Sequence, residues 1–248
     1  MEVHRYDLEV EFDALVRETQ HAVEGWDWNR GAYGHALSLP ARRQLHPHGR
    51  YRYENHPCLG VLGQLPAFRE VFDALECEKA SFRLLRRAPG SAYSWHIDRG
   101  KGQGVVRFQI PLVSDESAFL LTTDYWNVDQ VRGPRSVPLE EESFERFARA
   151  NAGHYRRHQL EPGCLHYFDT SRVHTLVNAG SGDRITLSFD LVVNDWVLGR
   201  FPEVRAEVGD DPVKPPPRPG PLRRGLSAAL TRLYPMRNLA RRHLPSHS

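Results

Sequence analysis

The sequence contains few cysteines, no strong excess of charge and no long apolar run. Its 248 residues include three cysteines, Cys58, Cys77 and Cys164, which are widely spaced and form no Cys-x-x-Cys pair. An odd number of cysteines without a pattern argues against a disulfide framework. It fits free thiols in a reducing compartment.

Charge and hydrophobicity exclude two classes of partner. The formal net charge is only +2, so nothing draws the whole chain toward nucleic acid or a membrane surface. No apolar stretch approaches the ~20 residues that a membrane span needs, and the first residues lack the apolar run of a signal peptide. We therefore expect a cytoplasmic protein with no integral membrane segment and no nucleic-acid partner.

The composition is 40% hydrophobic and 26% charged, which is typical of one globular domain with appendages. Apolar residues recur at helical spacing over 11–23 and 65–76, which predicts two amphipathic helices. A short strand is expected at 36–40, followed by a polar loop at 42–56. We expect residues 1–80 to form a helical and loop part packed on a core.

From residue 81 onward the apolar pattern becomes alternating. Strands are predicted at 81–87, 105–112, 119–123, 154–160, 164–169 and 184–193. Many short strands joined by turns with Gly and Pro are typical of a closed or double-sheet all-β unit such as a jelly roll. We therefore expect a mainly β core over 81–209.

The core is interrupted at about 124–153. Acidic residues follow Pro138, as they do in the first turn of many helices, and they predict a helix that runs to about residue 150. Two interpretations of this inserted helix are open. It forms a lid or substrate wall, or it is a surface excursion without a role in the site.

The composition changes again beyond residue 209. Residues 210–221 are rich in proline, which predicts an extended linker. Residues 222–248 carry six arginines and no acidic residue. This basic tail is disordered, packs back on the body as a helix, or contacts an acidic partner, a membrane surface or a carrier protein.

Three residues have the chemistry of a metal centre. His96 and Asp98 are separated by one residue, so a strand would place both side chains on the same face. His174 lies far downstream. Two imidazoles and one carboxylate leave three coordination positions open, as in the facial triad of non-heme Fe(II) oxygenases. The same ligands suit catalytic zinc, so a zinc-dependent hydrolase is an alternative, and a non-catalytic jelly-roll binding module is another.

Two arginines near these ligands are candidates for binding a carboxylate. Arg184 lies ten residues after His174, where its planar fork would match a dicarboxylic co-substrate; a structural salt bridge is the alternative. Arg107 shares a strand face with Gln109, and a buried arginine needs an anion. That anion is an internal acid or a ligand carboxylate, and we favour the ligand.

Four segments stand out in order along the chain: RLLRRAPGSAYSWHID at 83–98, RFQIPL at 107–112, EPGCLHYFD at 161–169 with the following Val-His and Val-Asn pairs, and RITLSFD at 184–190. Together they resemble the motifs of the aspartyl/asparaginyl β-hydroxylase family. The resemblance covers about 81–193. Asp98 and Gln109 differ from the human-type members, so the chain is closest in motif to bacterial free-standing amino-acid hydroxylases of the proline type.

The resemblance implies a double-stranded β-helix fold, Fe(II), O2 and 2-oxoglutarate as co-substrate. It also implies that His96, Asp98 and His174 hold iron and that Arg184 pairs with the distal carboxylate of 2-oxoglutarate. Arg107, with Gln109 on the same strand face, is expected to help to bind the co-substrate. The implied reaction is hydroxylation of a C–H bond in an amino acid or in an aminoacyl or peptidyl side chain, with formation of succinate and CO2. The candidate substrate contacts are Trp26, Trp28, Arg86, Tyr93 and Trp126.

Overall fold

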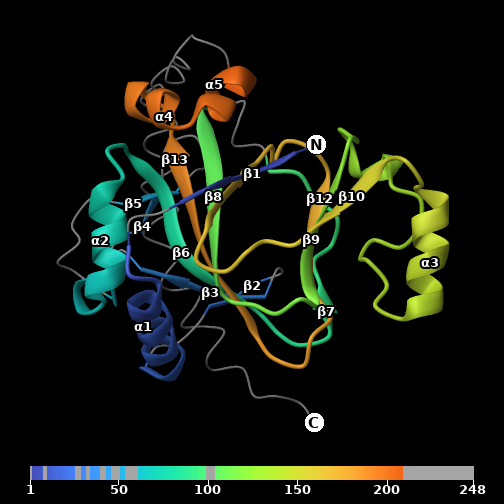
Figure 1. Ribbon diagram of the computed structural model, residues 1–248, viewed down its shortest axis with the longest axis horizontal. Coiled ribbons are helices and arrows are strands. Elements are labelled where there is room, and N and C mark those ends of the chain that lie inside the picture. Colours follow the sequence, from blue (N-terminus) through green and yellow to red (C-terminus); the bar gives the residue numbers. More distant parts are fainter. Residues whose placement is uncertain are drawn as a thin grey trace.

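The computed structural model describes residues 2–7, 10–25, 29–31, 34–39, 43–45, 51–53, 61–98 and 104–208. Two antiparallel sheets lie face to face at its centre (Figure 1). The larger sheet has the order β1 (Val3–Tyr6), β11 (Leu165–Phe168), β8 (Val105–Val113), β13 (Arg184–Val192), β6 (Lys79–Arg87), β3 (Gly34–Ser38) and β2 (Asn29–Gly31). The smaller sheet has the order β10 (Tyr155–His158), β9 (Ala118–Thr123), β12 (His174–Asn178) and β7 (Ser91–Ala92).

This strand order confirms the mainly β fold with a double-stranded β-helix core. From β6 to β13 the chain passes back and forth between the two sheets, with β9 and β10 both in the smaller one, so β6, β8, β11 and β13 oppose β7, β9, β10 and β12. A separate hairpin pairs β4 (Arg43–Leu45) with β5 (Tyr51–Tyr53). No helix among the described residues is long and apolar enough to cross a membrane.

Alternation along β13 divides the larger sheet into an apolar and a polar face. Leu187 and Phe189 point to the apolar face and join the main core cluster. Ser188 and Asp190 point to the other face, toward the space between the sheets, because successive side chains of a strand point to opposite sides. The polar face is therefore the interior of the β-helix.

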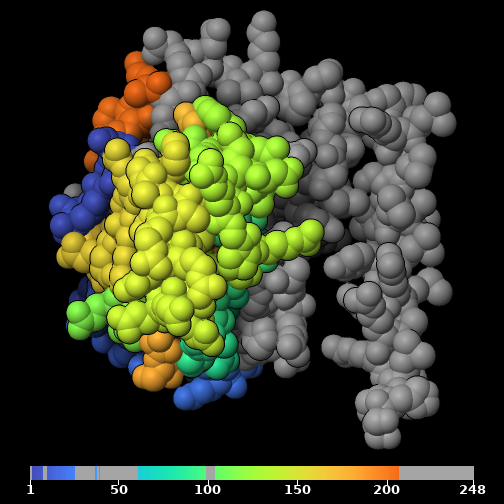
Figure 2. All heavy atoms as spheres, turned by 90° about the vertical axis from the view of Figure 1, so that its right-hand side faces the viewer, coloured from blue at the N-terminus to red at the C-terminus, as the bar shows by residue number. Residues whose placement is uncertain are grey.

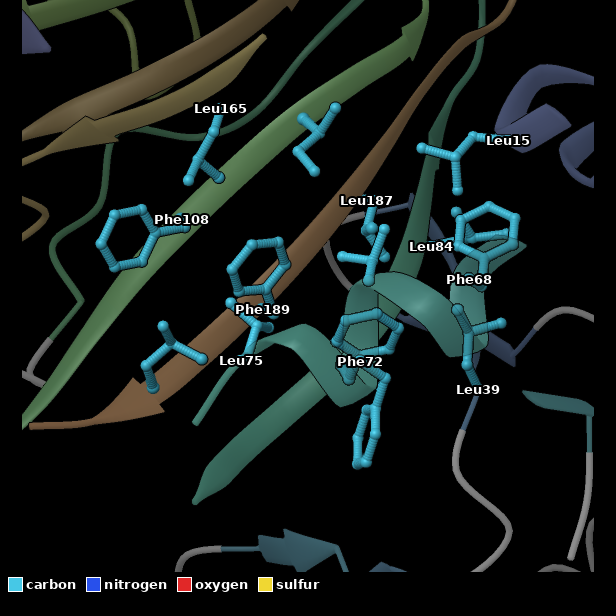
Figure 3. Packing of buried hydrophobic residues seen from close by; sticks show 14 of the residues in the cluster. Leu15, Leu39, Phe68, Phe72, Leu75, Leu84, Phe108, Leu165, Leu187 and Phe189 are labelled. Carbon is cyan, nitrogen blue, oxygen red and sulfur yellow. The ribbon is translucent and has the colours of Figure 1, made fainter. Parts of the chain in front are cut away.

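Helices cover the apolar face of the larger sheet. They are α1 (Phe12–Gly25), α2 (Pro66–Ala74), α4 (Asp195–Arg200) and α5 (Pro202–Val208), with a 3-10 turn at Val61–Gln64. Figure 3 shows Phe189 of the sheet between Phe108 and Phe72 of α2, and Leu15 of α1 near Leu84 and Phe68. The aromatic rings of Phe108 and Phe189 stack at 5.9 Å.

One side chain of α1 completes the start of α2. The first backbone N–H groups of a helix lack intrahelical partners, and Leu65 at the N-cap offers no side-chain acceptor. The Glu18 carboxylate accepts from the backbone N–H of Ala67 at 2.8 Å and of Phe68 at 3.1 Å. This contact fixes the two helices together over the sheet.

The inserted helix, α3 (Glu141–Ala150), packs on the outer face of the smaller sheet, after a 3-10 turn at Val128–Gln130. Phe147 is buried and its ring stacks on Trp95 at 5.4 Å. Figure 2 shows the yellow-green insertion on the surface of that side. The helix thus supports the sheet from behind, and the excursion is tied to the core through an aromatic cluster.

Most predicted elements are confirmed, including both helices before residue 80. Two expectations are wrong. The His96 segment is not a continuous strand, since only single bridges join Ser94 to Ser136 and His96 to His174. The polar loop at 42–56 contains β4 and β5, because alternating tyrosines favour extended backbone. The linker and the basic tail lie outside the described residues, and the domain division stays a prediction.

Candidate metal centre

His96, Asp98 and His174 come together at one point, with one ligand atom of each within 4.8 Å of the others. The His174 Nε2 atom lies 3.7 Å from Asp98 Oδ2, and the two imidazole centroids are 4.3 Å apart. Two backbone hydrogen bonds join the histidines, His96 N to His174 O at 3.1 Å and His174 N to His96 O at 3.0 Å. A single bridge of backbone therefore replaces the expected strand and gives the same convergence.

Both imidazoles are held in the tautomer that binds a metal. His96 Nδ1 lies 2.9 Å from the Ser94 carbonyl oxygen, and His174 Nδ1 lies 2.8 Å from that of Arg172. Because a carbonyl oxygen only accepts, each Nδ1 carries the proton and each Nε2 carries the lone pair. Such a hydrogen bond is the usual way in which a metal-binding histidine is oriented.

The surroundings also favour neutral His174. Burial lowers its pKa to about 4, and the neighbouring His96 acts in the same direction. A neutral imidazole is the form that donates a lone pair to a metal ion. Metal binding near neutral pH therefore requires no proton loss from this side chain.

Arg107 contacts two carboxylates of the protein. Its Nη1 donates to Asp98 Oδ2, while its Nε and Nη2 donate to the two oxygens of Asp190 at 2.6 and 3.0 Å. Burial acts to lower the pKa of Arg107, but the two carboxylates raise it. Of the two anions that the sequence left open for Arg107, the structure shows the internal acid. A contact of Arg107 with a ligand carboxylate stays a prediction.

The interior face of the larger sheet carries several buried polar atoms without a hydrogen-bond partner. They come from β6, β8, β11 and β13, and they are Arg83 Nε, Gln109 Oε1, His166 Nδ1, Arg184 Nε, Thr186 Oγ1 and Ser188 Oγ. Buried polar groups are rarely left unpaired in folded proteins. Their gathering on one interior face fits a site that is completed by a polar ligand.

Arg184 is the largest of these groups and is only 3% exposed. It pairs in register with Arg87 of β6, whose guanidinium lies 3.2 Å above the ring of Tyr93. Among the described residues, no carboxylate contacts Arg184. Burial lowers its pKa to about 10, and Arg87 adds to this effect. The salt-bridge alternative for Arg184 is thus absent from the described part of the chain.

The candidate substrate residues are placed differently from one another. Tyr93 is buried beside the triad, with its ring 5.8 Å from that of His96. Arg86 donates to Asp183 at 2.7 Å, so an internal acid is its partner. Trp126 is 57% exposed and lies under the guanidinium of Arg172 at 3.0 Å. Trp26 and Trp28 lie outside the described residues.

Sequence reasoning missed several residues of this interior. Asp190, Thr186 and Ser188 occupy every second position of a strand whose other positions are apolar and buried. In a strand covered on both sides, such an alternation marks a polar interior face. The residues could therefore have been found, although their partners could not.

The comparisons with known proteins concern structure. No protein-family model and no curated protein matches the chain. The structure resembles the non-heme α-ketoglutarate-dependent epimerase SnoN from nogalamycin biosynthesis, with a TM-score of 0.47 and 11% identity over 77% of this chain and 76% of that one.

Two further solved structures are similar. HygX from Streptomyces hygroscopicus, with nickel and 2-oxoglutarate bound, has a TM-score of 0.46 and 13% identity over 78% of this chain and 83% of its own. A Pseudomonas putida prolyl-4-hydroxylase has a TM-score of 0.43 and 15% identity over 77% and 92%. Because each TM-score is below 0.5, the functional argument depends on the residues of this chain.

Proposed function

We propose that this protein is an Fe(II)- and 2-oxoglutarate-dependent hydroxylase. One observation carries the proposal: the His-Asp-His triad lies beside an interior face on which Arg184 Nε and other buried polar atoms have no hydrogen-bond partner. The triad fits a divalent metal, and the interior face fits a polar, anionic co-substrate. The two lie together inside one β-helix.

The donor set fits Fe(II). Two neutral imidazole nitrogens and one carboxylate make the facial triad, in which three coordination positions stay open. With 2-oxoglutarate and O2 bound, Fe(II) supplies the oxidative chemistry by which a substrate C–H becomes C–OH while 2-oxoglutarate and O2 become succinate and CO2. The residues of this chain supply the geometry and exclude water.

Arg184 would bind the distal carboxylate of 2-oxoglutarate. Its guanidinium offers two parallel N–H donors, the arrangement that matches a carboxylate. Thr186 lies two residues along the same face, so its hydroxyl, which has no partner, is placed to donate as well. An anion bound here would offset most of the free-energy cost of burying the Arg184 guanidinium.

The rival functions use less of what is present. A zinc-dependent hydrolase would employ the same three ligands, but it leaves Arg184 without a use. A non-catalytic binding module would use the interior face and leave the oriented tautomers of both histidines unexplained. The oxygenase is the function that uses both features.

The substrate class follows the resemblance of the four motifs. We propose an amino acid, or an aminoacyl or peptidyl side chain similar to Asp, Asn or Pro, as the target of hydroxylation. Tyr93 and the exposed Trp126 are the described candidates for contacting it. Arg86 is a weaker candidate because Asp183 already accepts from its guanidinium.

A succinate assay tests the proposal. Purified protein would be incubated with Fe(II), ascorbate and 2-oxoglutarate, and a panel of amino acids and peptides would be added in turn. Succinate formation that a panel member stimulates, and that Asp98→Ala abolishes, is the expected result. Hydrolysis with zinc alone would indicate the first rival, and ligand binding without turnover in the wild-type protein would indicate the second.

A further inference from the structure

The carboxylate of the candidate metal centre is held by residues of the larger sheet. Asp98 lies beyond the last strand of its segment, and its backbone N–H donates to the Thr170 carbonyl at 2.7 Å. Its side chain accepts from Arg107 of β8, which donates with two further nitrogens to Asp190 of β13. Ser81 of β6 donates to Asp190 at 3.0 Å.

We propose that Asp190 and Arg107 are positioning residues for the metal ligand Asp98. The bridge of hydrogen bonds from Asp190 through Arg107 to Asp98 prepares the site to bind a divalent ion. The inference rests on the proposed metal centre. It assigns Arg107 a role different from the co-substrate contact that the sequence resemblance implies. It adds Asp190 and Ser81, to which the proposed function gave no role.

The Asp190–Arg107 pair is held in place by the larger sheet. Asp190 pairs in register with Arg107 on one side and with Ser81 on the other, at the centre of three hydrogen-bonded strands. Both oxygens of Asp190 are occupied, so its orientation and that of the guanidinium are fixed. Only one donor group of Arg107 is then directed at Asp98, and it sets the carboxylate toward His174.

The charge balance of the bridge also suits a cation site. A lone arginine beside a metal ligand would repel the incoming ion and weaken its binding. Asp190 offsets this charge, so the three side chains of Asp98, Arg107 and Asp190 together carry a net charge of −1, the same as Asp98 alone. The protein thereby orients the ligand and keeps its attraction for a divalent cation.

Metal affinity in three variants tests the proposal. Asp190→Asn keeps the shape and removes the charge, Arg107→Lys keeps the charge and removes the fork, and Ser81→Ala removes one hydrogen bond. Asp183→Asn is the matched control, because Asp183, just before β13, accepts from Arg86 of β6 in an ion pair outside the triad. Each protein would be titrated with Co(II) alone, and its visible absorption spectrum and melting temperature would be recorded.

We expect the dissociation constant for Co(II) to rise about tenfold or more in Asp190→Asn and Arg107→Lys, the range in which partners of metal ligands act. The Co(II) absorption bands should also change, because the ligand geometry changes. Ser81→Ala, the mildest variant, should show the same spectral change to a smaller degree, and it decides the outcome if Asp190→Asn does not fold. Asp183→Asn should match the wild-type protein in both readouts.

Two results would overturn the proposal. The first is a Co(II) dissociation constant within twofold of the wild type, with an unchanged Co(II) spectrum, in both Arg107→Lys and Ser81→Ala. It would show that the bridge does not position Asp98. Unchanged Co(II) affinity with about tenfold weaker binding of 2-oxoglutarate in Arg107→Lys would make Arg107 a co-substrate ligand instead. Asp98→Ala distinguishes failure of this proposal from failure of the proposed metal centre. If Asp98→Ala bound Co(II) as tightly as the wild-type protein, the triad would not be the site of the ion and the proposed metal centre would be wrong.

Discussion

At the scale of the residue, Arg184 is a buried cation that no carboxylate of the described residues contacts. Burying a cation without an anion costs several kcal/mol by order of magnitude, and a protein tolerates this cost where binding of an anionic ligand offsets it. Arg184 is buried at the end of a row of unpaired polar atoms on β13, all on the interior face. The account therefore depends on this residue being unsatisfied in the ligand-free protein.

The first prediction concerns that cost. Arg184→Leu should leave the melting temperature of the ligand-free protein equal to or above that of the wild type, because an apolar side chain suits the buried position. Added 2-oxoglutarate with Co(II) should raise the melting temperature of the wild type beyond the effect of Co(II) alone, and this further rise should vanish in the variant. Arg149→Leu, an exposed change on α3, is the control and should keep the rise. A wild-type response in Arg184→Leu would remove the carboxylate role.

The second prediction concerns pH. Burial lowers the pKa of His174 to about 4, against an ordinary value of 6.5. Between these values the unfolded chain binds a proton that the folded protein does not, so the free energy of unfolding should rise with pH across this window. In the metal-free protein, His174→Gln should make this rise smaller. The measurement is denaturant unfolding of both proteins across the window; equal slopes would contradict the assigned pKa.

How far the sequence could predict the site is also decided at this scale. His96 and Asp98 could be linked by their spacing along the chain, whereas His174 and Arg184 were assigned through the order of the motifs. Asp190 and Arg107 are 83 residues apart, and their contact depends on the register of β13 against β8. Periodicity within one strand cannot give the register between two strands, so the internal partners of Arg107 could not be predicted.

At the scale of the element, α3 supports the segment that carries His96. Phe147 stacks on Trp95, and Trp95 neighbours His96 along the chain. The helix was predicted from its acidic first turn, while its place behind the smaller sheet was left open between two interpretations. A helix position depends on which apolar patch it covers, and that patch forms only when β9, β12 and the Trp95 segment come together.

The third prediction tests this support. Phe147→Ala should lower the free energy of unfolding by about 3–5 kcal/mol, the usual cost of removing a buried phenylalanine. Glu145→Ala on the exposed side of α3 should change it by about 0.5 kcal/mol or less. Urea unfolding of the two variants provides the measurement. Equal effects would mean that the helix does not contribute to the core.

At the scale of the whole molecule, the candidate centre joins the two sheets. His174 belongs to the smaller sheet, whereas Asp98 is held by Arg107 and Asp190 of the larger one. The overall architecture was predictable because alternation in many short strands is a strong pattern. Which faces of the two sheets lie against each other was not predictable, because this arrangement depends on pairing between residues far apart in the sequence.

The fourth prediction follows from that junction. A metal ion that binds only the folded protein should stabilise the whole chain by about 2.7 kcal/mol at a hundredfold excess over its dissociation constant. Co(II) should therefore raise the melting temperature of the wild type, EDTA should reverse the rise, and Asp98→Ala should show neither effect. A similar rise in Asp98→Ala would place the ion elsewhere.

The most direct measurement is an anaerobic titration with Fe(II) followed by 2-oxoglutarate, monitored by visible absorption. We predict one Fe(II) and one 2-oxoglutarate per chain, an absorption change that requires both, loss of this change in Asp98→Ala, and a greatly raised 2-oxoglutarate requirement in Arg184→Ala. Absence of binding in the wild type, or binding that neither substitution alters, would contradict the account.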